Sequence, residues 1–105
     1  MERNAINYIL KKGESSVSKL FILRYSKNDQ AFNRYCVIIS RKVDTKAVTR
    51  NKLRRQIYEA IRLTAQNLKP SESNLDIILI PKKSVKEKTF EAIQTDLREI
   101  IINHG

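Results

Sequence analysis

The chain is short and strongly basic. It has 105 residues, and its 21 Lys and Arg against 11 Asp and Glu give a formal net charge of +10. This length predicts one domain, residues 1–105, with one modest core. The charge favours a phosphate-rich partner, nucleic acid first, over a generic soluble enzyme. The sequence has no membrane-length apolar run and no signal-like segment, so we expect a cytoplasmic protein without a membrane partner.

The first predicted element is a short helix. Residues 3–12 place three apolar side chains on one side of such a helix, namely Ile6, Ile9 and Leu10. Gly13 stands where a helix C-cap is expected. Ser15 and Ser16 are expected to form a connection to the next element.

Two strands are predicted next. Residues 20–25 are aromatic and β-branched enough for a strand, and the turn-prone residues 26–29 are expected to end it. Residues 35–40 predict a second strand. Because the link between the two is short, they are expected to pair as an antiparallel hairpin.

The longest predicted element is an amphipathic helix over residues 47–68, which Pro70 and the polar residues 71–74 are expected to end. Its core-facing residues share one sector of a helical wheel: Leu53, Ile57, Ala60, Ile61, Thr64 and Leu68. A neighbouring sector carries Asn51, Arg54, Arg55, Tyr58 and Arg62. Cations near a helix N-terminus oppose its macrodipole, so their crowding here indicates a polyanionic ligand.

A buried strand and a closing helix complete the chain. Residues 75–80 are almost continuously apolar, which predicts a central strand buried on both faces. Ser84 and Glu87 have the spacing of a capping box. The helix behind them has its apolar residues at Phe90, Ile93, Leu97, Ile100 and Ile101. The order α-β-β-α-β-α predicts a small α+β sandwich with helices over a mixed sheet.

The sequence offers little for protein-centred catalysis or for a metal site. His104 lies one residue from the C-terminus, where a shaped pocket is not expected. Cys36 lies mid-strand and is interpreted as a buried small hydrophobe in a reducing compartment. The acidic residues are dispersed and form no cluster suited to Mg²⁺. Any catalysis therefore requires another molecule to supply most of the chemistry.

The basic helix has two interpretations, a solvated charged face and a phosphate-binding face. Within the helix only Glu59 can pair with Arg55 or Arg62, so most of the cations are not neutralised. Phosphate could be bound by the N–H groups of the first turn together with Arg50, Asn51 and Lys52. Such an array contacts the nucleic-acid backbone and its shape rather than a base sequence.

Residues 41–55 resemble the signature of the bacterial ribonuclease P protein family, the "RNR" family. In that family a strand ending in Ser-x-Lys-Lys leads into a helix opening with Arg-Asn-Arg-x-Lys-Arg; here the run is Ser40-Arg41-Lys42 followed by Arg50-Asn51-Lys52 and Arg54-Arg55. The resemblance covers nearly the entire chain. It implies a two-layer α/β sandwich, α-β-β-(β)-α-β-α, with a mixed central sheet and a left-handed βαβ crossover (ribosomal protein S5 domain 2-like).

The resemblance also implies a function as the protein subunit of ribonuclease P. In the family, the RNA subunit removes the 5′ leader of precursor tRNA with Mg²⁺, which is held with the RNA and not at a dedicated protein site. The protein binds this catalytic RNA and the leader, and no small-molecule substrate is implied. The positions implied to contact RNA are Arg41, Lys42, Lys46, Arg50, Asn51, Lys52, Arg54, Arg55 and Arg62.

A leader groove between the first helix and the sheet is implied as well. Ile6 and Leu10 fall at helix positions that are aromatic in the family, and Tyr25 matches a strand tyrosine. Ser40 and Tyr58 complete the implied set. Aliphatic side chains give apolar contact rather than base stacking. A plain core stripe is the alternative interpretation of Ile6 and Leu10.

Two other classes of protein share the charge and size. A structural RNA binder such as a small ribosomal protein explains the charge and fold class equally well, but not the ordered motif. A DNA-binding regulator could use residues 50–62 as a recognition helix. Affinity for duplex DNA that equals or exceeds affinity for folded RNA would favour the DNA-binding regulator over the two RNA-binding classes.

Overall fold

The computed structural model describes residues 2–30, 32–65 and 74–104, with the side chains of 102–104 outside the description. Within these ranges the structure has three α-helices, four strands and a short 3₁₀ helix. Their order is α1 (Arg3–Lys12), β1 (Glu14–Val17), β2 (Phe21–Asn28), β3 (Arg34–Val37), α2 (Ala47–Ala65), β4 (Asn74–Pro81), η1 (Lys83–Glu87) and α3 (Phe90–His104).

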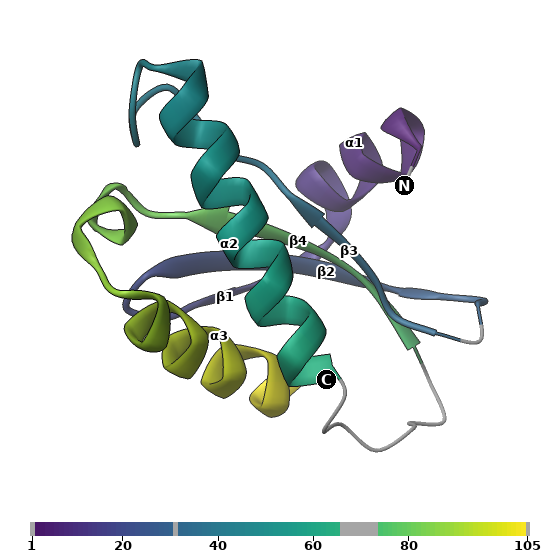
Figure 1. The fold of residues 1–105 in the computed structure, drawn as a ribbon. Helices are drawn as coiled ribbons and strands as arrows, with labels where there is room; N and C mark the ends of the chain where they lie inside the picture. The colour runs from purple at the N-terminus through teal and green to yellow at the C-terminus, as the bar shows by residue number, and fades with distance from the viewer. Residues whose placement is uncertain (1, 31, 66–73, 105) are drawn as a thin grey trace.

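The sheet has the order β1-β2-β4-β3 and is mixed (Figure 1). β2 is antiparallel to both β1 and β4, whereas β3 is parallel to β4. The chain passes from β3 to β4 through α2. With α2 in front of the sheet in Figure 1, both parallel strands run toward the left and β3 lies above β4, so this crossover is left-handed. The implied α+β architecture is therefore confirmed.

Strand pairing differs from the sequence-based expectation in two places. The predicted hairpin between the strands near 20–25 and 35–40 is wrong, because β4 lies between β2 and β3. Ser15 and Ser16, expected to be a connection, belong to β1 and pair with β2. Local residue preferences do not specify which distant strand becomes the neighbour, so the short link alone was misleading.

The observed ends of two strands also differ from the predicted ends. β2 continues through the predicted turn to Asn28, because its last residues pair with the first residues of β4. β3 begins at Arg34 and ends at Val37, earlier than the predicted end at 40. The residues after Val37 instead form the irregular segment that leads into α2.

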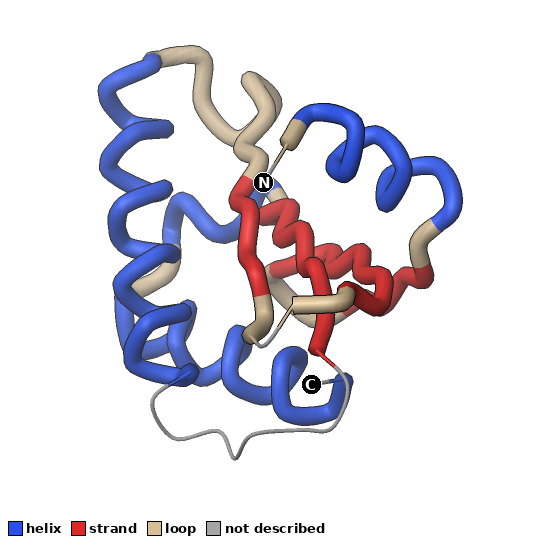
Figure 2. Tube along the Cα trace, turned by 90° about the vertical axis from the view of Figure 1, so that its right-hand side faces the viewer, coloured by secondary structure: helices blue, strands red, loops and turns tan. Residues whose placement is uncertain are grey.

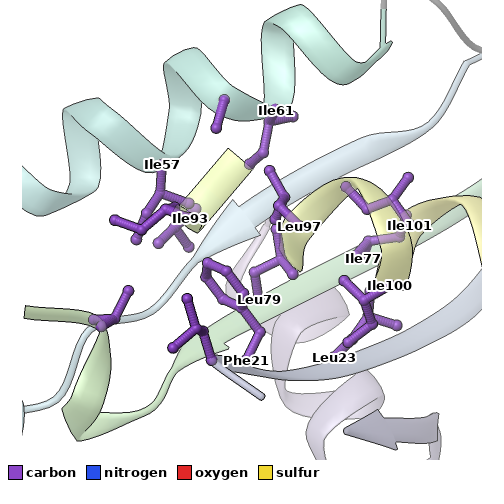
Figure 3. Close-up of a cluster of buried hydrophobic side chains, with 14 of the residues drawn as sticks. Phe21, Leu23, Ile57, Ile61, Ile77, Leu79, Ile93, Leu97, Ile100 and Ile101 are labelled. Carbon is purple, nitrogen blue, oxygen red and sulfur yellow. The ribbon is translucent and has the colours of Figure 1, made fainter. Parts of the chain in front are cut away.

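The helices lie on both faces of the sheet. α2 and α3 cover one face, and α1 lies against the other (Figure 2). The main core fills the space between the sheet and the two helices α2 and α3. Side chains of α2, α3, β2 and β4 point toward one another there (Figure 3). The labelled members are Phe21, Leu23, Ile57, Ile61, Ile77, Leu79, Ile93, Leu97, Ile100 and Ile101. Burial of each such side chain contributes roughly 1.5–3 kcal/mol.

The prediction of a central strand buried on both faces is confirmed for β4. Ile77 and Leu79 face the main core, while Ile78, which is fully buried, points to the side that α1 covers with Ile9. The described part of α2 has the predicted apolar stripe at Leu53, Ile57, Ala60, Ile61 and Thr64. Leu68, Pro70 and residues 71–73 lie outside the described residues.

The start of the last helix differs from the prediction. Residues 83–87 form the 3₁₀ helix η1, so the predicted capping box at Ser84 and Glu87 is wrong. Val85 is fully buried, which explains why the chain turns inward there. α3 begins at Phe90, and the Thr89 hydroxyl accepts a hydrogen bond from the Ala92 N–H at 3.2 Å. Thr89 is therefore the N-cap.

The C-terminal end of α1 is fixed closely to the sheet. The Gly13 backbone is extended, and its N–H donates to the Ile9 carbonyl at 2.8 Å. A Cβ atom at Gly13 would lie 2.5 Å from that carbonyl oxygen and 2.9 Å from the carbonyl oxygen of Tyr25. The Arg24 guanidinium donates to the carbonyls of Ile9 and Gly13, at 3.3 and 3.1 Å. Glycine is needed here for close approach.

A polar cluster joins the β2–β3 connection to β4. Asp76 is 6% exposed, and its two carboxylate oxygens accept hydrogen bonds from the Arg34 guanidinium at 2.6 and 2.5 Å. Asn28 donates to the same carboxylate at 2.8 Å. Donation by Arg34 holds the pKa of Asp76 below its ordinary value, although burial acts in the opposite direction. The ionised carboxylate is therefore part of the folded structure.

This cluster predicts a pH-dependent stability difference for Asp76→Asn. Because the pKa of Asp76 is lower in the folded state, its charge stabilises the fold above its unfolded pKa of about 3.9, and this contribution is lost as pH falls through the folded value. Urea unfolding should show the variant less stable at neutral pH, with the difference from the parent shrinking below about pH 4. Asp29→Asn, an exposed change in the adjoining connection, is the control; a pH-independent difference would contradict the assignment.

Candidate nucleic-acid interface

The N-terminal half of α2 presents cations on the side opposite its buried stripe. Leu53 and Ile57 face the core, while Lys52 and Arg55 are exposed. Neither of these two cationic side chains makes an ion pair or hydrogen bond with any residue the structure describes. Their charges are thus available to an external anion.

Asn51 and Arg54 form a pair on the same helix. The Arg54 guanidinium donates to the Asn51 side-chain oxygen at 2.8 Å. This contact uses the acceptor of the amide and leaves its two N–H groups as donors. The pair therefore presents donors to the outside, as phosphate binding requires.

Arg50 has a second role in addition to its charge. One guanidinium nitrogen donates to two carbonyls of the preceding segment, that of Asp44 at 3.0 Å and that of Thr45 at 2.8 Å. The side chain therefore folds back over the entry to α2. Part of its donor fork is used within the protein, and the rest is open to a ligand.

Arg62 differs from the other predicted contact residues because it is paired. Its guanidinium donates to both carboxylate oxygens of Glu59, at 3.1 and 2.5 Å. The pair raises the pKa of Arg62 and lowers the pKa of Glu59, chiefly through these hydrogen bonds. Of the two partners considered for Glu59, the structure selects Arg62 and leaves Arg55 open.

The segment before α2 carries four more predicted residues, Ser40, Arg41, Lys42 and Lys46, and all are exposed. A local turn shapes this segment: the Ser40 hydroxyl accepts from the Lys42 N–H at 3.2 Å, and the Ser40 carbonyl accepts from the Val43 N–H at 3.1 Å. Val43 is buried in the main core. This anchor holds the segment next to the start of α2, so the structure brings the two basic groups together.

Tyr58 links α2 to the outer strand of the sheet. Its hydroxyl accepts a hydrogen bond from the Val37 N–H at 3.1 Å, and the residue remains 39% exposed. β3 is an edge strand, and the Val37 N–H points away from β4 because the neighbouring Ile38 N–H donates to Leu79. Tyr58 thus satisfies an edge donor and also keeps an accessible ring.

The implied leader set is not brought together by the fold. Tyr25 lies on the same sheet face as Phe21 and Leu23 and packs against the main core, which is the face of α2 and α3. Ile6 and Leu10 belong to α1 on the other face. Because alternate strand residues point to opposite faces, the Tyr25 side chain lies on the face opposite α1.

The residue of β2 that faces α1 is Arg24, which is not among the residues predicted from the sequence. Within α1, Ile9 is the buried residue, Ile6 is half-buried and Leu10 is 37% exposed. The core-stripe interpretation thus fits Ile9 better than Leu10. The one sequence signal for this role of Arg24 is strand alternation, which puts Arg24 on the face opposite Leu23 and Tyr25.

The remaining candidates for chemistry are scattered. Cys36 is a half-buried free thiol rather than a fully buried one. His104 is the last residue of α3, and its side chain is outside the description. Across the described ranges, no three His, Cys, Asp or Glu residues are grouped so that they could hold a metal ion. Over the same ranges, no helix is both long and apolar enough to cross a bilayer.

The fold and this surface define a small basic α+β protein with a left-handed βαβ unit, whose crossover helix is suited to a polyanion. Comparison with known proteins identifies the family within this class. The family model "Ribonuclease P" matches residues 1–104. The chain belongs to the ribonuclease P protein family.

Individual relatives and solved structures agree with this assignment. The ribonuclease P protein component of Mesoplasma florum is 32% identical over 90% of this chain and 83% of its own length. That of Clostridioides difficile is 34% identical over 89% and 79%. The RNase P protein structure from Thermotoga maritima matches with a TM-score of 0.81 at 27% identity, covering 93% of this chain and 89% of that one. A Staphylococcus aureus RNase P protein gives 0.81 at 26% identity, covering 96% and 89%.

The contact between Tyr58 and β3 predicts a specific loss in Tyr58→Phe. Because the Val37 N–H loses its protein acceptor, the free energy of unfolding should fall by about 0.5–1.5 kcal/mol. Urea unfolding monitored by circular dichroism measures this. Tyr8→Phe is the matched control, since Tyr8 is 57% exposed on α1; equal stability changes in both variants would contradict the edge-capping role.

Proposed function

We propose that this chain binds the catalytic RNA of ribonuclease P and the 5′ leader of precursor tRNA. In this role it assists endonucleolytic removal of the leader to give the mature tRNA 5′ end. The observation that carries the proposal is the exposed cationic face at the start of α2, with Lys52 and Arg55 unpaired among the described residues. Family membership supports the RNA partner.

The division of labour follows from the chemistry available. Electrostatic contacts to phosphates supply affinity without base readout. The donors of exposed Asn51, Lys52 and Arg55, and of half-buried Arg54, suit that purpose. The described residues do not group into a donor set for a metal ion. We therefore assign Mg²⁺ and the cleavage step to the RNA, and assign binding and positioning to this chain.

Leader contact is proposed for a smaller set than the resemblance implied. Ile6 and Leu10 remain candidates on α1, and Ser40 and Tyr58 on the side of α2 and β3. Tyr25 is omitted because it faces the main core. Aliphatic side chains at α1 provide apolar contact, and Tyr58 offers a ring for stacking at about 1–3 kcal/mol per base.

Reconstitution tests the proposed function directly. Added to a bacterial-type ribonuclease P RNA at low Mg²⁺, the full chain should increase the rate of precursor-tRNA cleavage above that of the RNA alone. The double variant Arg54→Ala/Arg55→Ala serves as the matched control and should stimulate less. If the parent chain gave no stimulation, the proposal would fail; tighter binding to duplex DNA than to the folded RNA would favour a DNA-binding regulator.

The ion pairing on α2 predicts different salt dependences for two arginines. Arg55→Ala should flatten the log–log dependence of RNA affinity on salt by roughly one unit, because each phosphate contact contributes about 0.7–0.9. Arg62→Ala should change the slope much less, since Glu59 already neutralises Arg62. Filter binding or fluorescence anisotropy over a salt series measures both slopes. An unchanged slope in Arg55→Ala would mean that this face is only solvated.

A further inference from the structure

Asp44 is an acid placed within the cationic surface. It is the one acidic residue in the run from Ser40 to Lys46, and its side chain is only 9% exposed. A carboxylate at this position repels an approaching phosphate. Its presence on a surface suited to a polyanion therefore needs a compensating role.

Both carboxylate oxygens of Asp44 are engaged. Oδ1 accepts from the Lys46 N–H at 2.7 Å, directly before the first residue of α2. Oδ2 accepts the ammonium group of Lys86 from η1, also at 2.7 Å. The side chain thus connects the entry of α2 to an element that lies forty-two residues further along the chain (86 − 44).

The backbone of Asp44 adds a third contact. Its carbonyl accepts from the Arg50 guanidinium at 3.0 Å, and the next carbonyl, that of Thr45, accepts from the same nitrogen at 2.8 Å. Hydrogen bonding by Lys86, and then by the Lys46 N–H, lowers the pKa of Asp44, so the carboxylate stays charged at neutral pH. One residue therefore fixes the direction of Arg50 and the path of the chain into α2.

We propose that Asp44, held by Lys86, is a positioning residue for binding of the RNA backbone. It fixes the backbone that leads into α2, and with it the position of the Arg50 side chain, before RNA binds. The gain in RNA affinity from this preordering exceeds the loss caused by repulsion between the carboxylate and phosphate. The inference rests on the proposed function, because it requires this surface to contact RNA. A segment that is already ordered loses less conformational entropy on binding.

A charge-matched control distinguishes positioning from simple electrostatics. Asp44→Ala removes a negative charge beside Lys46 and Lys86, and Glu59→Gln removes one beside Arg62, so electrostatics alone predicts tighter RNA binding for both. Positioning predicts that Asp44→Ala weakens binding to a bacterial-type ribonuclease P RNA by about tenfold. Glu59→Gln, which releases Arg62, should bind as well as the parent or better.

Two further variants test the route through Lys86. Asp44→Asn keeps an oxygen for the Lys46 N–H but loses the ionic contact, so its affinity should fall between those of the parent and Asp44→Ala. It also carries the test if Asp44→Ala does not fold. The double variant Asp44→Ala/Lys86→Met should bind like Asp44→Ala alone, because the two residues act together. A double variant that bound RNA clearly more weakly than Asp44→Ala would overturn the coupling.

A stability control excludes a general weakening of the fold. Asp96 accepts hydrogen bonds from the Ser18 hydroxyl at 2.6 Å and the Leu20 N–H at 3.0 Å, so Asp96→Ala should destabilise the β1–β2 connection. It should leave RNA affinity unchanged. If Asp96→Ala weakened RNA binding as much as Asp44→Ala, the positioning role would be overturned.

The two hypotheses fail in different ways. If Arg55→Ala flattens the salt slope while Asp44→Ala binds as tightly as the parent or more tightly, the proposed function stands and the positioning role is overturned. If Arg55→Ala leaves the slope unchanged, the RNA-binding face itself is misassigned and the role of Asp44 fails with it. A tenfold loss in Asp44→Ala, with normal binding by Glu59→Gln and Asp96→Ala, supports both.

Discussion

The apolar stripe of α2 packs against the sheet and α3, and this burial fixes the rotation of the helix about its own axis. Ile57 is completely buried, and Leu53 and Ile61 are nearly so. Turning the helix to hide its cations would expose this stripe, at roughly 1.5–3 kcal/mol for each large side chain. The direction in which the cations point is therefore set by the hydrophobic core.

Local contacts then divide the cations of this surface into two groups. Arg62 is neutralised by Glu59 and Arg50 is partly used by backbone carbonyls, whereas Lys52 and Arg55 remain open among the described residues. A count of positive charges along the helix treats these residues as equivalent. Only the cations without an internal partner can release counterions fully from a bound polyanion. Fewer residues therefore contribute fully to binding than the motif contains.

Long-range polar contacts hold the elements around this surface. Arg24 joins the end of α1 to the sheet, and Arg34 with Asp76 joins the β2–β3 connection to β4. Tyr58 attaches α2 to the edge strand. Each contact satisfies a backbone or charged group that would otherwise be unpaired at a junction between elements, where leaving such a group unpaired is costly.

The sequence by itself determined the elements with strong periodicity and the family. α1 has the predicted bounds of 3–12, β4 is the predicted central strand, and α3 has the predicted apolar stripe. These follow from local repeats of apolar side chains, which depend on neighbours a few residues away. The ordered Arg50-Asn51-Lys52 and Arg54-Arg55 run identified the family for a similar reason, because its information is contiguous in the chain.

The tertiary structure alone decided what depends on distant partners. β4 separates β2 from β3, a choice made by burial of a strand that comes almost forty residues later than β3. The face of Tyr25 depends on strand register, where an error of one residue reverses the side of the sheet. The partner of Asp44 is Lys86, far along the chain. No local pattern specifies such pairs, because only the completed fold brings the two side chains within bonding distance.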